Sequence, residues 1–336
     1  MNRFLLGLTR FMGLGSLVFA ASALSPALAA QPSYQAMVVF GDSLSDTGND
    51  FAATTAQQMV PAIPPSVGQY ATYWKGRFSN GPVAVEYLWR LVARKNNAEV
   101  TPFIVDPAID KKGAVNFAFG GAGSGVRNLT PNGFPVPGLL GQVGLYTQAL
   151  AGRKSNANAL YVVWSGANDY LQDLEYDPTK IVGNVEAAIG GLYASGARDF
   201  MVPNLPDLGN TPLIKVRGTA AATAFTGFAK AHNALLATRL TALSKTLPGS
   251  KFVRVDVFAL GQALINSGVI NDDVPAIKFL SPTSGAEQCL FVNPAACVDV
   301  DDLRFLAPFL YWDVLHPTTQ VHGVIGTAMY LALLKK

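Results

Sequence analysis

Charge, cysteine and histidine are all scarce in this sequence. Among its 336 residues are two cysteines and three histidines, and charged residues make up 14% of the chain, with a formal net charge of +3. A chain with so little positive charge offers no basic face to nucleic acid, so no nucleic-acid partner is expected. Half of the residues are hydrophobic. That content is far too high for a disordered chain and suits one large domain.

Long apolar runs are also scarce, apart from one near the N-terminus. Two arginines precede an apolar run over residues 11–24, and a small-x-small motif ends at Ala29. This order of features is typical of a secretory signal peptide, and the run is short for a membrane-spanning helix. The sequence therefore predicts a signal peptide over residues 1–29, cut near Ala29, and a single mature domain over residues 30–336. We expect that domain to be exported, either to a periplasm or to the outside of the cell.

The two cysteines, Cys289 and Cys297, both lie in the part expected to be exported. An oxidising compartment favours a disulfide between them, closing a short loop, and two free thiols are the alternative. No histidine lies near them in sequence, so a zinc site is not expected. The acidic residues within 299–302 lack the glycine and the spacing of a calcium loop. We expect no metal and no cofactor.

Apolar, β-rich runs alternate with helical patterns along the mature chain. The strand candidates are residues 35–40, 114–119, 160–164, 200–203 and 252–257. Apolar residues at helical spacing follow Pro82, at Val85, Leu88, Leu91 and Val92, and recur over 181–192, 228–240 and 321–331. Strands that alternate with helices predict an α/β fold with a parallel sheet covered on both faces. Two stretches, at about 50–80 and 267–312, look like irregular insertions that could form binding walls or lids.

Polar signatures follow three of the predicted strands. They are Gly41-Asp42-Ser43, Gly120-Gly121 and Gly166-Ala167-Asn168-Asp169. In a parallel sheet the carboxyl ends of the strands meet at one edge, where ligands bind. A serine there is either a helix cap or a nucleophile, and a nucleophilic serine needs a histidine base that a carboxylate orients.

The three histidines differ in their surroundings. His232 and His322 fall inside predicted helices and are interpreted as structural. His316 lies in a loop before the last helix, and Asp313 precedes it by three residues. In a turn of helix-like geometry, such a spacing puts both side chains on one side. Ser43, His316 and Asp313 are therefore the candidates for nucleophile, base and orienting acid.

Acyl transfer also requires donors for a negatively charged oxygen. The backbone N–H groups of Ser43 and Gly121 and the side-chain amide of Asn168 are candidates, because glycine allows close approach and asparagine offers two uncharged donors. Two carboxylates have structural interpretations: Asp42 bonding its own turn, and Asp169 securing the loop that presents Asn168. The aromatic side chains within 70–78 either line an acyl pocket or pack the insertion.

Four blocks of this sequence resemble one known family. "FGDSLSDTGN", "NFAFGGAG", "GAND" and "DVLH" occur in the order found in the GDSL, or SGNH, hydrolases. The match runs from about Tyr34 to the C-terminus. The resemblance implies a flavodoxin-like three-layer α/β/α sandwich with a mostly parallel five-stranded sheet. It implies Ser43 as nucleophile, His316 as base and Asp313 as the residue that orients it. It also implies an oxyanion hole of Ser43, Gly121 and Asn168, and it favours Gly121 over Gly120.

Further segments resemble the bacterial secreted phospholipase/acyltransferase subgroup, which includes lysophospholipases, hemolysin-like lipases and a cholinesterase. These segments are "KGRFSNGPVAVEYL", "NLPDLGNTP" and "WDVLHPTTQVH". The resemblance implies an esterase or lipase that acts on small-molecule or lipid esters, such as lysophospholipids, with peripheral contact to membrane lipid. Two alternatives stay open: an acyltransferase that moves the acyl group to a sterol or other alcohol, and a short-chain esterase that acts on choline or carbohydrate esters. The oligomeric state is not readable from the sequence.

Overall fold

The computed structural model describes residues 33–335 except for 69–70, 108, 110–112, 274, 280–296 and 300–308. Residues 32–336 group into one compact unit. The expected signal peptide and Cys289 lie outside the described residues, and of Cys297 only the backbone is described. The predicted disulfide and signal peptide therefore stay predictions.

A parallel sheet forms the centre of the described chain. Its strand order is β2-β3-β1-β6-β7-β8, and every neighbouring pair is parallel. The strands are β1 (Ala36–Gly41), β2 (Val100–Pro102), β3 (Gly113–Asn116), β6 (Leu160–Trp164), β7 (Asp199–Pro203) and β8 (Lys251–Val255). The α/β prediction is confirmed, but the expected strand number of five is wrong, because β2 adds a sixth. This edge strand has three residues and ends in proline, so it carries almost no strand pattern of its own.

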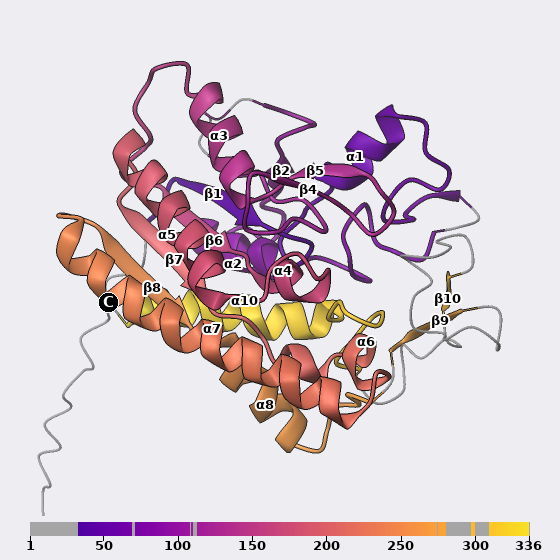
Figure 1. The fold of residues 1–336 in the computed structure, drawn as a ribbon. Helices are drawn as coiled ribbons and strands as arrows, with labels where there is room; N and C mark the ends of the chain where they lie inside the picture. Colours follow the sequence, from indigo (N-terminus) through magenta and orange to yellow (C-terminus); the bar gives the residue numbers. More distant parts are fainter. Residues whose placement is uncertain are drawn as a thin grey trace, which may run out of the picture. The chain divides into compact units, whose positions relative to one another are not determined.

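Both faces of the sheet are covered by helices, as Figure 1 shows. In β1, Met37 and Val39 pack in one cluster while Val38 and Phe40 pack in the other. This alternation follows from the two-residue period of a strand. The first cluster includes side chains of α2 (Ala84–Ala93), α8 (Val257–Asn266) and α10 (Thr319–Leu334). The second includes side chains of α3 (Leu139–Ala149), α5 (Pro178–Ser195) and α7 (Thr219–Thr246).

The four helices expected from apolar spacing are α2, α5, α7 and α10. In α2, Leu91 is exposed, so the expected apolar face is narrower than the pattern predicts. Helices α3 and α8 were not expected. Val257, expected to end a strand, instead begins α8. The stretch expected to be irregular from residue 50 begins with a helix, α1 (Asn49–Ala56).

Several short elements lie at the carboxyl edge of the sheet or beside it. They are the hairpin of β4 (Arg127–Leu129) and β5 (Pro135–Pro137), the short helices α4 (Ala167–Leu171) and α6 (Pro212–Lys215), and the antiparallel pair β9 (Ile277–Phe279) and β10 (Cys297–Asp299). No helix among the residues that the structure describes is long and apolar enough to cross a membrane.

The position of β1 in the sheet explains why candidate site residues lie just after this strand. The chain leaves β1 to build β2 and β3 on one side and returns to build β6 on the other, so the strand order reverses at β1. Open α/β sheets bind ligands at such a switch point. Gly41 ends β1 close to β6, and a Cβ atom on it would lie 2.4 Å from the Trp164 carbonyl oxygen. Only glycine allows this approach, and the segment that carries Ser43 starts from it.

Candidate active site

Ser43, His316 and Asp313 form one continuous hydrogen-bonded chain. The Ser43 hydroxyl lies 2.8 Å from His316 Nε2, and His316 Nδ1 lies 2.6 Å from Asp313 Oδ2. A carboxylate only accepts, so Nδ1 carries the proton and donates it to Asp313. Nε2 is then the acceptor for the Ser43 hydroxyl. All three side chains are buried. The structure thus brings together the three residues that the sequence selected, from positions 273 residues apart.

Asp313 has more partners than the sequence predicts. Its Oδ1 accepts from the backbone N–H groups of Leu315 and His316, and its Oδ2 also accepts from the Tyr73 hydroxyl at 2.7 Å. Burial acts to raise the pKa of Asp313, but the neighbouring His316 and these backbone donors outweigh it, and the pKa lies below its usual range. The carboxylate therefore stays charged where it can stabilise a protonated imidazole. Tyr73 also packs against Ile63 and Phe78 in a buried cluster, as one of the two roles expected from the sequence requires, and its bond to Asp313 adds a role that the sequence did not indicate.

A tight turn presents His316. The backbone N–H of Trp312 donates to the His316 carbonyl at 2.7 Å, and the Thr318 N–H donates to the Leu310 carbonyl at 3.1 Å. The Phe78 ring lies 5.1 Å from the imidazole, between ring centres. The imidazole is therefore held by bonds on both nitrogens and by an aromatic neighbour, which limits its rotation.

Gly121 and Asn168 lie beside Ser43 and are held by one loop. The Asn168 amide donates to the Ala122 carbonyl at 3.0 Å, and it has no second hydrogen-bond partner among the described residues. Gly121 has a φ of +74°, a conformation that favours glycine. Its carbonyl accepts from the side-chain amides of Asn128 and Gln172, at 2.7 and 2.8 Å. These two amides fix the peptide of Gly121, and nothing in the sequence pattern indicated them.

Two nearby carboxylates do what the sequence predicted. Asp169 accepts from the backbone N–H and the hydroxyl of Ser124, at 2.8 and 2.7 Å. This ties the start of α4, which carries Asn168, to the loop after Gly121. Asp42 accepts from the Leu44 N–H at 3.0 Å, within its own turn. Burial raises the pKa of Asp42 to about 7.

The other two histidines are buried inside the fold and lack such a chain of partners. His232 Nδ1 faces the Tyr170 hydroxyl at 3.4 Å, and His322 Nδ1 accepts from the Ala84 N–H at 3.2 Å. Their Nε2 atoms have no hydrogen-bond partner among the described residues. Burial lowers the pKa of His232 to about 4 and that of His322 to about 3. Both stay neutral at neutral pH, in agreement with a structural role.

A cavity of about 370 Å³ opens onto the Ser43–His316 pair. Its lining is mostly apolar and comes from the β4–β5 hairpin, from α4 and the residues after it, and from α6 and the turn around His316. Besides Ser43 and His316, the lining residues are Phe78, Gly121, Leu129, Thr130, Pro131, Asn168, Leu171, Gln172, Leu174, Leu213, Arg217 and Leu315. The site thus combines an activated hydroxyl, nearby N–H donors and an apolar cavity. Within the described ranges, no three His, Cys, Asp or Glu residues gather closely enough to hold a metal ion.

Comparison with known proteins identifies the relatives of this chain. Residues 37–329 match the GDSL-like lipase/acylhydrolase family. A phosphatidylcholine-sterol acyltransferase of Aeromonas hydrophila is 29% identical over 88% of this chain and 89% of its own length. A GDSL esterase/lipase of Arabidopsis thaliana is 25% identical over 88% and 89%, respectively.

Other relatives are longer or more distant. An anther-specific proline-rich protein of Arabidopsis thaliana is 27% identical over 90% of this chain, but the chain spans only 62% of that protein's length. Among solved structures, a carbohydrate acetylesterase from Sinorhizobium meliloti aligns with 89% of this chain and 98% of its own. It has 13% identity and a TM-score of 0.41.

Proposed function

The chain belongs to the GDSL-like lipase/acylhydrolase family, and we propose that it hydrolyses lipid esters through an acyl-enzyme formed on Ser43. As a member of this family it is a hydrolase that acts on carboxylic esters. The observation that carries the proposal is the apolar cavity that opens onto a serine hydroxyl 2.8 Å from a histidine Nε2.

The geometry supports a two-step reaction. Ser43 Oγ attacks the ester carbonyl carbon while His316 Nε2 takes the hydroxyl proton. The negative charge that develops on the carbonyl oxygen meets the N–H groups of Ser43, Gly121 and Asn168. His316 then gives its proton to the departing alcohol. In the second step His316 takes a proton from water, which attacks the acyl carbon. The bond between Ser43 Oγ and the acyl carbon then breaks, His316 returns the proton to Oγ, and the carboxylic acid leaves.

A lipid ester suits the cavity better than a small polar ester. Leucines contribute much of the lining, and two of them, Leu129 and Leu174, are 57% and 47% exposed at its mouth. Apolar surface exposed next to a pocket is typical of a binding site for apolar ligands or for a lipid surface. The acyl chain would cover these leucines and remove them from water.

A release assay tests the proposal. The mature protein and its Ser43→Ala variant would be compared on nitrophenyl esters from acetate to palmitate and on lysophosphatidylcholine. We expect release that depends on Ser43 and persists on long chains and on the lysolipid. Ser45→Ala is the matched control, since it removes a buried hydroxyl two residues away that has no partner among the described residues. Hydrolysis that survives Ser43→Ala would contradict the mechanism, and release confined to acetate and butyrate would contradict the lipid substrate.

A second candidate is acyl transfer to an alcohol. It is supported by the similarity to the Aeromonas hydrophila phosphatidylcholine-sterol acyltransferase. The first step is the same, and an alcohol replaces water in the second. Product analysis with cholesterol added distinguishes the two: cholesteryl ester supports transfer, and free fatty acid alone supports hydrolysis.

Export is part of the proposal. It is supported by the arginines, the apolar run and the small-x-small motif within residues 1–29. Expression of the full chain in a bacterial host, followed by fractionation and N-terminal sequencing, tests it. A product outside the cytoplasm that begins near Ala30 is expected. An uncut product in the cytoplasm would contradict export.

A further inference from the structure

Arg217 is the one side chain with a permanent charge among the described residues that line the cavity. Among the lining residues that the structure describes, none is an aspartate or a glutamate. A guanidinium keeps its charge at any physiological pH and presents a fixed fork of N–H donors. A cavity built only for an acyl chain would gain nothing from such a group. The cation therefore calls for an interpretation beyond ester hydrolysis itself.

The backbone near Arg217 is bonded to the turn that carries Asp313 and His316. In α6, the Leu213 N–H donates to the Val314 carbonyl at 2.9 Å, one residue beyond Asp313. Lys215, at the end of α6, forms an ion pair with Asp272 at 3.0 Å. Arg217 follows directly, and its N–H donates to the Ile214 carbonyl at 2.9 Å. The guanidinium therefore starts from a backbone position fixed relative to His316.

The charge of Arg217 is not neutralised by a carboxylate among the described residues. Arg77 and Lys215 pair with Glu86 and Asp272, respectively. The Arg217 guanidinium instead lies over the Phe225 ring, with its Cζ atom 5.8 Å from the ring centre. A ring contact leaves the N–H edges of a guanidinium free to bind an anion.

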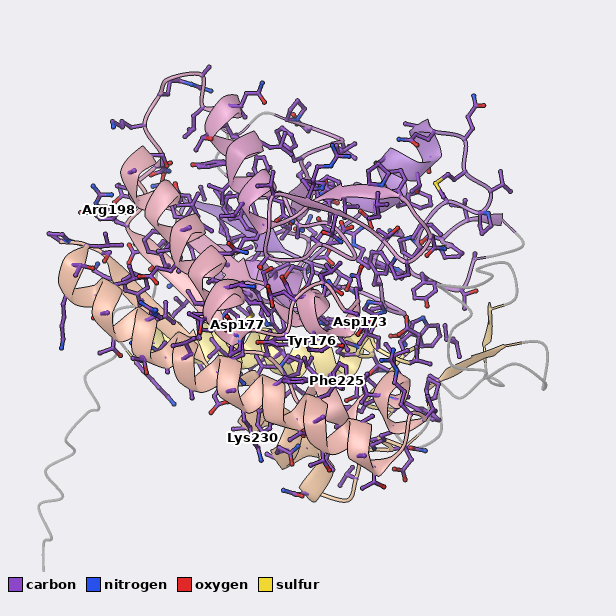
Figure 2. All side chains as sticks on the ribbon, viewed as in Figure 1. Asp173, Tyr176, Asp177, Arg198, Phe225 and Lys230 are labelled. Carbon is purple, nitrogen blue, oxygen red and sulfur yellow. The ribbon has the colours of Figure 1, made fainter. Side chains whose placement is uncertain are left out.

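One acidic residue, Asp173, lies beside the aromatic group that includes Phe225. The Tyr176 ring lies edge-on to the Phe225 ring, and the Tyr176 hydroxyl donates a hydrogen bond to Asp173. Figure 2 shows Asp173, Tyr176 and Phe225 close together. Asp173 thus has a hydrogen-bond partner of its own.

We propose that Arg217 determines specificity by binding a phosphate group in the alcohol portion of the ester. In a lysophospholipid a glycerol unit separates the reacting ester from the phosphate, so both groups can occupy one cavity. The phosphate then pairs with Arg217 while the ester lies at Ser43 and the acyl chain contacts the leucines. This inference rests on the proposed function and deepens it. Arg217 would thus favour phosphate-bearing esters over neutral acylglycerols, whereas the apolar lining alone would accept both equally.

The test compares two esters that differ only in the phosphate. They are 1-hexanoyl-glycerol 3-phosphate and 1-hexanoyl-glycerol, whose short chains keep both in monomeric solution. Arg217→Gln keeps a polar side chain and removes the charge, and Arg217→Lys keeps the charge without the fork. Arg127→Gln is the control, because Arg127 is exposed on the β4–β5 hairpin and lines a separate hollow.

We expect Arg217→Gln to raise KM for the phosphate ester about 10- to 100-fold, the size typical of charge-assisted hydrogen bonds. Its kcat, and both constants for the neutral ester, should change less than about twofold, and Arg217→Lys should recover part of the loss. Equal losses on both esters would overturn the inference in favour of a structural role. An equal loss from Arg127→Gln would overturn it in favour of general electrostatic attraction.

A binding measurement separates this inference from the proposed function. Calorimetry with the phosphate ester would use Ser43→Ala and the double variant Ser43→Ala/Arg217→Gln. Weaker binding to the double variant by at least about tenfold supports the role of Arg217, even if the native protein hydrolyses neither ester and the proposed function fails. Equal affinities would overturn the role of Arg217, even if the native protein hydrolyses both.

Discussion

The groups proposed to carry out the reaction and the groups proposed to select the substrate are held in different ways. The first set, the strand-end cluster, consists of Ser43, Gly121, Asn168, Asp313 and His316. The second, the cavity mouth, consists of Leu129, Leu174 and Arg217. Side chains of the strand-end cluster are buried and bonded to one another or to the loops around them. Those of the cavity mouth are exposed and have few partners. Reaction geometry is thus fixed by dense hydrogen bonding, while specificity is left to side chains that tolerate change.

The largest loss of activity within the strand-end cluster is expected from Asp313→Asn. An amide in this place donates to His316 instead of accepting, which favours the wrong tautomer of the imidazole. We expect kcat to fall about 10⁴-fold, the loss typical when the carboxylate of such a triad becomes an amide. Steady-state kinetics on a nitrophenyl ester measures it. Asp177→Asn, at the exposed start of α5, should keep full activity. A loss below about tenfold would show that Asp313 does not orient the base.

Burial next to the strand-end cluster should also have a cost in stability at Asp42, the residue before Ser43, and Asp42→Asn isolates this cost. Burial raises the pKa of Asp42 to about 7. The folded protein therefore holds this proton more tightly than the unfolded chain does. The stability it contributes is complete below about pH 4 and is lost as pH rises through 7. Asparagine has no proton to lose there.

We expect the free energy of unfolding of native protein to drop between pH 4 and pH 8 by up to about 4 kcal/mol more than that of the variant. Urea unfolding across this range measures it. The buried His232 and His322 have the opposite sign, since their lowered pKa values make acid destabilising, but both proteins contain them. Asp273→Asn, at an exposed carboxylate, is the control. If the free energy of unfolding of the native protein and of Asp42→Asn changed with pH in parallel, ionisation of Asp42 would not destabilise the folded protein.

Next in size is the effect expected at Asn168 of α4, the proposed oxyanion donor. Asn168→Ala removes an amide that no other described side chain replaces. We expect kcat to fall about 10²- to 10³-fold with little change in KM, because the donor acts on charge that develops only in the transition state. Asn158→Ala, at an exposed site, should have no effect. A rise in KM without a fall in kcat would instead assign Asn168 to substrate binding.

These residues were predictable because the sheet brings strand ends together. Ser43, Gly121 and Asn168 each follow a strand of strong apolar pattern, so topology alone placed them at one edge. His316 was selected because the chain has few histidines and the other two fall inside helices. The six-stranded sheet was not predictable in full, since β2 is too short to show a period. Asn128 and Gln172 act through backbone contacts of a loop, which leave no spacing signal.

Tyr73 is the clearest case of a residue that the sequence could not assign. It lies 240 residues from Asp313 and meets it through an irregular segment. We expect Tyr73→Phe to lower kcat about tenfold with KM unchanged, since one hydrogen bond to a charged group is lost next to the base. Tyr87→Phe is the matched control, because it removes a tyrosine hydroxyl bonded to Thr319 rather than to Asp313. Equal kcat values for the two variants would show that the Tyr73 hydroxyl serves packing alone.

The smallest effect should come from the cavity mouth, and it should depend on the substrate. Leu129→Ser removes apolar surface that is already 57% exposed, so little packing within the protein is lost. In the variant, a bound acyl chain would lose only part of its contact with the leucine side chain. Each buried methylene contributes about 0.8 kcal/mol to such a contact. We expect kcat/KM to fall about threefold on a decanoate ester and to stay unchanged on acetate. Val126→Ser is the control, since Val126 is exposed on the same hairpin but does not line the cavity. An equal fall in kcat/KM on the acetate ester would mean that Leu129 affects the reaction at the strand-end cluster itself. The cavity mouth would then not act on substrate selection alone.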